Sequence, residues 1–216
     1  MTQAVRPATD PDPLRRATGR RTAAWLAALT ALAALALSLP PLRPLIEQSM
    51  VWHMLVQMPL LMLAGWWAAA AWGLPRGLRW NRFGLTGFML AQCIAAYWMI
   101  PAMVDRAVVL PSADAVKLVT LWIAGVALNL GYRQAPLAVQ LFFIGYGLPM
   151  MVWLGLYLAG TDLRLCNAYS LQSQLRAGWG WVGLASALGL AWALDLRLRP
   201  AASWTTESVP PGLVTN

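Results

Sequence analysis

The sequence predicts an all-α, polytopic bundle of about six transmembrane helices with both termini in the cytoplasm. Composition is the first observation behind this prediction. Of the 216 residues, 59% are hydrophobic and 11% are charged, whereas roughly 25% of an average soluble domain is charged. The second observation is that apolar runs of about 18 or more residues recur, each long enough to cross a hydrocarbon core ~30 Å thick.

Each apolar run is predicted to be one membrane-spanning helix. The first follows about 20 mostly polar residues and precedes no clear small-x-small cleavage site, so it is predicted to be a helix and not a signal peptide. The flanking segments, residues 1–22 and 197–216, are predicted to be cytoplasmic tails, the first of them basic and disordered, around a bundle of residues 23–196. The predicted spans are residues 24–39, 51–73, 84–104, 116–130, 137–159 and 179–194.

The basic residues are distributed unevenly between the two sides of the predicted membrane. The net charge is +8, and most of the arginines fall in the predicted cytoplasmic segments. This bias is the positive-inside pattern, which favours a multi-pass protein of the bacterial inner membrane. Nucleic acid binding is not indicated, because the basic residues are not interleaved with aromatic residues on one soluble face. The predicted outer side carries Arg43, Arg106, Lys117, Arg164 and Arg176.

The second span begins with a face that combines imidazole and thioether groups. At ~100° per residue, Met50, His53, Met54 and Gln57 fall within one face, and Met58 lies at its edge. His53 is the only histidine of the chain. Imidazole and methionine sulfur are suitable ligands for Cu(I), so this face is a candidate copper site near the outer end of a helix. Methionine also fills gaps in apolar cores, so packing remains the alternative interpretation.

The third span ends with a matching pair of methionines. Met99 and Met103 are four residues apart, hence on one helical face, at a depth similar to that of His53. Asp105 lies at the end of this span, where a carboxylate is usually solvated. Pro59 and Pro101 each remove a backbone hydrogen bond and are predicted to bend their helices.

The two cysteines are not expected to form a disulfide. Cys93 lies midway along the third predicted span, whereas Cys166 lies in the last outer loop. A residue ~11 positions from a helix end is ~16 Å deep, which is too far for a disulfide without a large movement of the loop. Cys166 is therefore either a packing residue or a single soft ligand.

The order of these motifs resembles the caa3-type cytochrome c oxidase assembly factor family, the CtaG-like integral membrane proteins, over residues 47–184. His53-Met54 with Gln57-Met58 resembles the family's His-Met-x-x-His-Met motif. Trp98-Met99-Ile100-Pro101 with the downstream Asp105 resembles its Trp-His-x-Pro and Asp. The segments 116–132 and 165–180, the latter with Tyr169, Gln174 and Gly178, are similar to its next helix and to its Tyr, Asp-Gln and Gly segment.

This chain departs from the family's pattern at its histidines. Gln57 stands where the family's second histidine would be, and Met99 stands where the histidine of Trp-His-x-Pro would be. Lys117 lies close to where a further histidine often begins the fourth equivalent helix, and at a helix end its ammonium group is expected to snorkel to water. His53 alone is retained. The metal site is therefore either rebuilt with thioethers or lost.

The resemblance implies an assembly or copper-handling factor for a respiratory cytochrome c oxidase, with oxidase subunits and membrane lipid as partners and no enzymatic activity. In this hypothesis Cu(I) passes on by ligand exchange at the outer face. Gln57, Asp105 and Lys117 would adjoin the ligands. The candidate ligands are His53, Met54, Met58, Met99 and Met103, with Cys166 as an exchange ligand on a mobile outer loop.

Other classes of function are less compatible with the residues. A single histidine does not supply the paired axial ligands of a bis-histidine haem. A secondary transporter would need ionisable residues at mid-depth and repeated halves, and neither is evident. A metal-free scaffold or accessory subunit of a respiratory complex remains the main alternative. Its small residues could serve contact with a partner or internal packing; these are Gly84, Gly87, Gly178, Gly180 and Gly183.

Overall fold

The computed structural model describes residues 13–39, 49–74, 79–166 and 168–198, and the regular structure within these residues is helical, without strands. The predicted all-α class is therefore confirmed. The helices are α1 (Pro13–Ala36), the π-helical η1 (Val51–Gln57), α3 (Met58–Trp72), the 3₁₀ segment η2 (Arg79–Gly84), α4 (Leu85–Trp98), α5 (Pro101–Val109), α6 (Pro111–Gln134), α7 (Leu137–Gly160) and α8 (Leu171–Leu198).

Several of these helices have the length and composition of membrane spans. Within the described residues, four stretches qualify on their own: Val51–Trp72, Pro111–Gln134, Leu137–Gly160 and Leu171–Leu198. A fifth candidate is the pair Arg79–Trp98 and Pro101–Val109, which is bent by 72° at the break. The chain is thus a membrane protein by the length and apolar character of its helices.

The first helix differs from its prediction. α1 begins at Pro13, so it extends into the segment 1–22 that the sequence predicts to be a disordered tail. Arg20 and Arg21 lie within its first half, and this polar beginning keeps α1 out of the apolar stretches named above. Residues 1–12 and 199–216 of the predicted tails lie outside the described residues.

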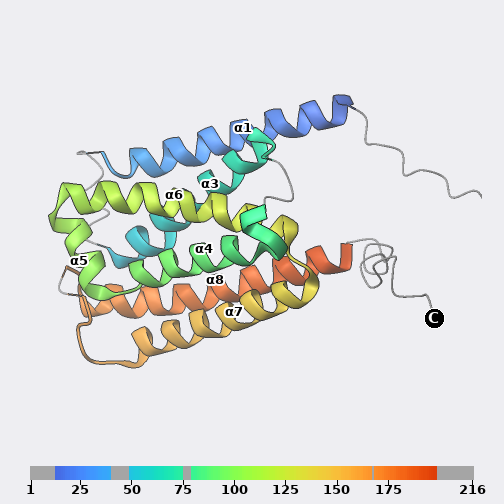
Figure 1. Ribbon diagram of the computed structural model, residues 1–216. Coiled ribbons are helices and arrows are strands. Elements are labelled where there is room, and N and C mark those ends of the chain that lie inside the picture. Colours follow the sequence, from blue (N-terminus) through green and yellow to red (C-terminus); the bar gives the residue numbers. More distant parts are fainter. Residues whose placement is uncertain (1–12, 40–48, 75–78, 167, 199–216) are drawn as a thin grey trace, which may run out of the picture.

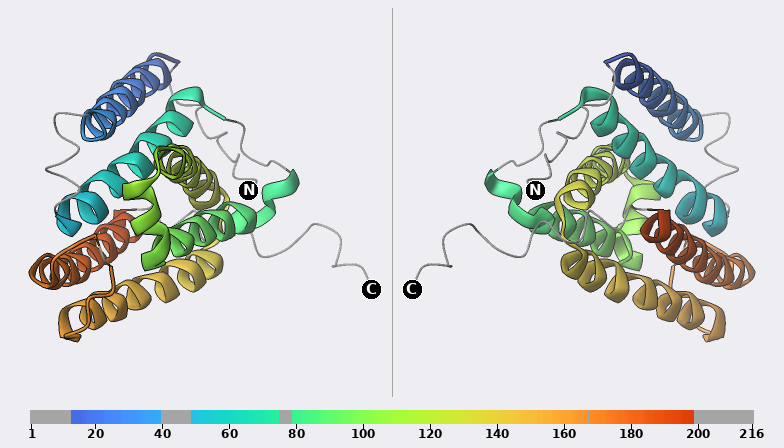
Figure 2. Two further views of the ribbon diagram at one scale, coloured as in Figure 1. Left: turned by 90° about the vertical axis from the view of Figure 1, so that its left-hand side faces the viewer. Right: turned by 90° about the vertical axis from the view of Figure 1, so that its right-hand side faces the viewer.

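Helix α6 is the central helix of the bundle. It packs against α3 on one side and α4 on the other, α1 packs on the outer face of α3, and α7 pairs with α8 (Figures 1 and 2). α8 also contacts η1. Figure 1 shows α5 and the α7–α8 connection at the same end of the bundle, which we call the α5 end. The opposite end, where η2 lies, is the η2 end.

The predicted span 84–104 is two helices and not one. α4 ends at Trp98, Ile100 is extended (φ −73°, ψ 120°), and Pro101 is the first residue of α5. The cause is Pro101, which has no N–H to continue the helix and disfavours helical backbone at the residue before it. The predicted bend at Pro101 is confirmed, and it turns α5 toward the start of α6.

The π-helical segment η1 lies directly before Pro59, where the sequence predicts the other bend. In η1 the backbone N–H of Met58 donates to the carbonyl of His53, five residues back. Pro59 cannot donate to the carbonyl of Leu55, and its ring would clash with that carbonyl in a regular helix. The π-helical turn relieves this clash and sets the direction of the side chains of His53 and Gln57; such turns often occur at functional sites.

Glycines allow the helices around α6 to approach closely. A Cβ added to Gly65 of α3 would lie 2.0 Å from the carbonyl oxygen of Trp122, and one added to Gly125 of α6 would lie 1.9 Å from that of Met62. Neither fits without separating the two backbones. Of the small residues singled out from the sequence, Gly84 and Gly87 meet α6 in the same way, Gly178 meets Gly155, Gly180 meets Leu55, and Gly183 has open space around it.

We predict that Gly125→Ala destabilises the protein by about 1–3 kcal/mol, because the added methyl group forces α3 and α6 apart. The thermal unfolding midpoint in detergent should fall. Gly183→Ala is the matched control, since nothing lies within 4 Å of a Cβ at that position. Equal midpoints for the two variants would contradict the proposed close approach of α3 and α6.

Candidate functional site

A cluster of buried polar side chains lies between η1 and the first turns of α6, toward the α5 end. His53 and Gln57 come from η1, while Asp114 and Lys117 come from α6. The side chains of Lys117, His53 and Gln57 are 1%, 2% and 3% exposed. Three polar side chains buried this deeply among apolar helices require satisfied hydrogen bonds.

Lys117 is the centre of this cluster. Its Nζ lies 2.6 Å from Asp114 Oδ1, forming an ion pair within one turn of α6. The same nitrogen donates to Gln57 Oε1 at 3.1 Å and lies 3.4 Å from His53 Nε2. An ammonium group has three N–H donors and no acceptor, so these three contacts match its hydrogen-bonding capacity.

The expected snorkelling of Lys117 to water is wrong. Snorkelling would leave the ammonium group exposed, whereas Lys117 is buried. The reason is that Asp114, one turn earlier on the same helix, supplies a counter-charge inside the protein. With that carboxylate and two neutral acceptors, the ammonium group has partners that replace its hydration.

Gln57 links the cluster to α1. Its Oε1 accepts from Lys117, and its Nε2 donates to Ser38 Oγ at 2.8 Å. Ser38 Oγ in turn donates to the carbonyl of Ala34 at 3.2 Å. A continuous hydrogen-bonded chain therefore runs from α6 through η1 to the end of α1, with its donors and acceptors arranged in one direction.

The contact with Lys117 determines the state of the His53 ring. An ammonium group can only donate, so a hydrogen bond across this contact needs His53 Nε2 as the acceptor, with the ring proton on Nδ1. A metal ion binds imidazole through a nitrogen lone pair. The Nε2 lone pair is already directed at Lys117, so metal binding through this nitrogen requires Lys117 to move away.

The remaining surroundings of His53 are apolar and aromatic. The ring of Tyr169 is tilted by 55° against the imidazole, with the ring centroids 6.2 Å apart. Met50, Met54 and Met58 are buried in the core cluster that also contains Tyr169. The face predicted from helical spacing, with Met50, His53, Met54 and Gln57, is therefore a buried face.

The other predicted site residues lie near this cluster but in different roles. Met99 and Met103 are partly buried and pack against the same core. Asp105 is in the middle of α5, where its Oδ1 accepts from the backbone N–H of Ala168 at 3.3 Å. Asp105 is thus a tether between α5 and the α7–α8 connection and not a solvated helix terminus.

Cys166 lies in the connection between α7 and α8. It is buried, and burial together with the negative charge of Asp105 raises the pKa of its thiol to about 11. Soft metals are bound by the thiolate, so this thiol is a poor ligand at neutral pH. Both cysteines are free, as predicted, and Cys93 is exposed.

Hydrogen bonds tie the connection that carries Cys166 to the start of α8. The buried side chain of Gln174 accepts from the backbone N–H of Leu165 at 3.0 Å and donates to the carbonyl of Leu163 at 3.0 Å. The hydroxyl of Ser173 accepts from the backbone N–H of Met50 at 2.7 Å, which joins the start of α8 to the start of η1. These bonds fix the α5 end around the cluster.

Within the described ranges, no three His, Cys, Asp or Glu side chains are grouped closely enough to hold a metal ion. A metal at His53 would therefore depend on thioether ligands. The arrangement as it stands holds a different cation, the ammonium group of Lys117.

Two partners in the cluster were missed by sequence reasoning. Asp114 is three residues before Lys117, and opposite charges at this helical spacing are a recognised signal of pairing. Ser38 carries no such signal, because its contact with Gln57 depends on how α1 packs against η1 and α3.

Comparisons with protein-family models, with curated proteins and with solved structures found no match to this chain.

We predict that Lys117→Met destabilises the protein by about 1–3 kcal/mol, because Asp114 then keeps its charge without a counter-ion and the acceptors of Gln57 and His53 lose their donor. The double variant Lys117→Met with Asp114→Asn should be more stable than the sum of the single effects predicts. Thermal or urea unfolding in detergent measures the stability of Lys117→Met, of Asp114→Asn and of the double variant. Strict additivity would mean that the two side chains do not form a pair.

Proposed function

We propose that this chain is an inner-membrane accessory or assembly factor for a respiratory cytochrome c oxidase, and that it acts without a bound metal. One observation carries the proposal. His53 and Gln57, which stand at the two histidine positions of the first motif of the caa3-type oxidase assembly factors, both contact Lys117, which lies close to where a further histidine often occurs. The function is thus assigned from the resemblance together with this contact.

The contact supports the resemblance independently of the sequence motifs. The same motifs could occur in the same order without these side chains meeting in space. Lys117 and His53 are 64 positions apart, on different helices. Aligning the motifs along the chain says nothing about which of them meet in space. Two matched positions and a residue close to a third, which converge on one buried point, are what a shared site would produce.

The lysine favours the metal-free form of this function. At ~4 Å in an effective dielectric constant near 20, two unit positive charges repel by about 4 kcal/mol. Because Nζ lies only 3.4 Å from His53 Nε2, a Cu(I) ion bound to that nitrogen would lie closer than this to the ammonium group, and the two cations cannot share the site. Asp114, Gln57 and His53 hold the lysine in place, and the cluster joins α1, η1 and α6 into a rigid outer end to which oxidase subunits would dock.

Copper handling is the second candidate, and the methionines favour it. Met50, Met54 and Met58 are buried in the core that surrounds His53, and Met99 and Met103 pack against that core. In this candidate the side chain of Lys117 leaves the cluster toward the α5 end, and Cu(I) takes its place on His53 and the thioethers. Asp114 would then balance the charge of the metal.

The topology that we propose has six spans, with α1 as the first and the bent pair α4 and α5 as the third. Charge supports placing both termini in the cytoplasm. Among the described residues, the η2 end carries Arg20, Arg21, Arg79, Arg82, Arg133 and Arg197 against Asp195, whereas the α5 end carries Asp105, Asp114 and Asp162 against Arg106, Lys117, Arg164 and Arg176.

We predict that a cysteine introduced at Asp162, in a Cys93→Ala and Cys166→Ala background, reacts with a membrane-impermeant maleimide in intact spheroplasts. A cysteine introduced at Arg82 in the same background should react only after the membrane is opened, because the η2 end faces the cytoplasm. The reverse pattern would contradict the proposed orientation.

We predict that deleting the gene in its source bacterium lowers cytochrome c oxidase activity in membranes, and that wild type restores the activity whereas Lys117→Met does not. Arg176→Gln is the control for a basic residue at the same end, and immunoblotting of each variant separates lost function from lost protein. Undiminished oxidase activity in the deletion strain would contradict the oxidase assignment.

Anaerobic titration of the purified protein with Cu(I) against a competing chelator separates the two candidates. The metal-free function predicts no binding by wild type above that of His53→Ala. Binding of about one Cu(I) by wild type, lost in His53→Ala, would establish the second candidate in its place.

A further inference from the structure

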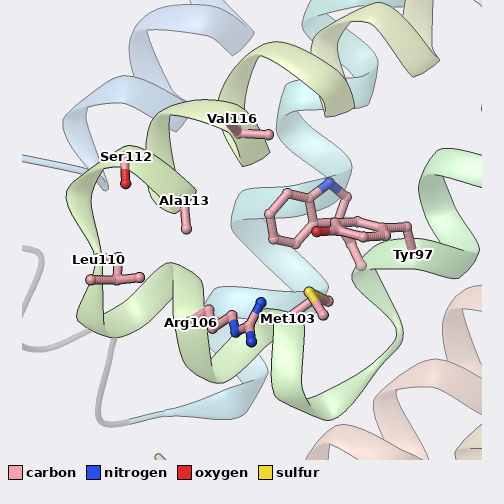
Figure 3. Close-up of a pocket in the computed structure, with 8 residues that line it drawn as sticks. Tyr97, Met103, Arg106, Leu110, Ser112, Ala113 and Val116 are labelled. Carbon is pink, nitrogen blue, oxygen red and sulfur yellow. The ribbon is translucent and has the colours of Figure 1, made fainter.

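An open pocket lies at the α5 end, on a side of α6 separate from the lysine cluster. Its volume is about 250 Å³, and its lining side chains come from the end of α4, from α5 and from the start of α6. Figure 3 shows these side chains around a common space, with Tyr97 on one side, Arg106 and Met103 below, and Val116 above. Lys117 is not among its lining residues.

The break between α4 and α5 creates this pocket. Because α5 turns by 72° from the direction of α4, a wedge of space remains between the end of α4 and the start of α6. Trp98 forms one wall and is held rigidly, since its indole N–H donates to Thr120 Oγ1 on α6 at 2.9 Å. The pocket is therefore a fixed feature of the fold.

The walls are apolar and continue onto the outer surface of the bundle. Tyr97, Leu110 and Val116 line the pocket and are 47%, 48% and 53% exposed. In a membrane, exposed apolar side chains on the outside of a helix bundle contact lipid chains. An acyl chain can therefore enter the pocket sideways from the bilayer without crossing water.

The polar end of the pocket is a guanidinium group. Arg106 is exposed, and within the described part of the chain its side chain forms no hydrogen bond or ion pair. The acids closest to it along the chain are engaged elsewhere, Asp105 with Ala168 and Asp114 with Lys117. A guanidinium group with no counter-ion among the described residues is suited to a phosphate group.

We propose that this pocket binds one anionic phospholipid, with its phosphate on Arg106 and an acyl chain along Tyr97 and Val116. In the proposed topology the α5 end meets the lipid headgroups, so phosphate and chain would each be placed at their natural depth. A free anion would gain the charge contact but nothing from the apolar walls.

The test is native mass spectrometry of the full-length protein, released from detergent after titration with dioleoyl phosphatidylglycerol or dioleoyl phosphatidylcholine. Wild type should bind phosphatidylglycerol more tightly, and Arg106→Gln should weaken that binding about ten-fold, the effect of losing one charge-assisted contact. Arg176→Gln, an exposed arginine of α8, should leave it unchanged. Ala113→Trp, which fills the pocket, should weaken binding of both lipids.

Three results would overturn the proposal. The first is equal binding of the two lipids by wild type. The second is an equal loss of phosphatidylglycerol binding in Arg106→Gln and Arg176→Gln, which would indicate a general effect of surface charge. The third is complete displacement of the lipid by inorganic phosphate at millimolar concentration, which would identify a site for the free anion.

Discussion

The burial of one ammonium group constrains the arrangement of this end of the bundle. Lys117 lies among apolar helices and is stable there because Asp114, Gln57 and His53 supply acceptors from two segments of the chain. These acceptors reach it only if α3 and α6 lie very close together. Gly65 and Gly125 permit that approach, because each faces a backbone carbonyl of the other helix.

This arrangement gives the site its own permanent cation. A transient metal site must bind and release its ion. The cation of a lysine side chain, in contrast, is covalently attached to the protein and is not released. The hydrogen-bonded chain from Lys117 through Gln57 to Ser38 transmits the position of this charge to α1. The cluster is therefore better suited to fixing the shape of the α5 end than to exchanging ligands, and this rigidity supports the proposed accessory role.

Local sequence patterns predicted the helices well and the contacts between them poorly. The bounds of α7 nearly match the predicted span 137–159, since its apolar run is uninterrupted, whereas α6 and α8 extend further because their polar ends remain helical beyond the apolar run. Pro101 signalled a bend, but only the structure shows a full break. The buried face of His53 followed from helical spacing. Its contact with Lys117 did not, because no local pattern records which distant helices meet.

The ammonium group of Lys117 occupies the position on His53 Nε2 that a metal ion would need. Solid-state NMR of the ¹⁵N-labelled protein in lipid tests it most directly, because Lys117 Nζ and His53 Nε2 are close enough for a through-space ¹⁵N–¹⁵N correlation. We expect this correlation to be present, the ring proton to lie on Nδ1, and neither to change when Cu(I) is added. A missing correlation, or a His53 signal that shifts when Cu(I) is added, would contradict it.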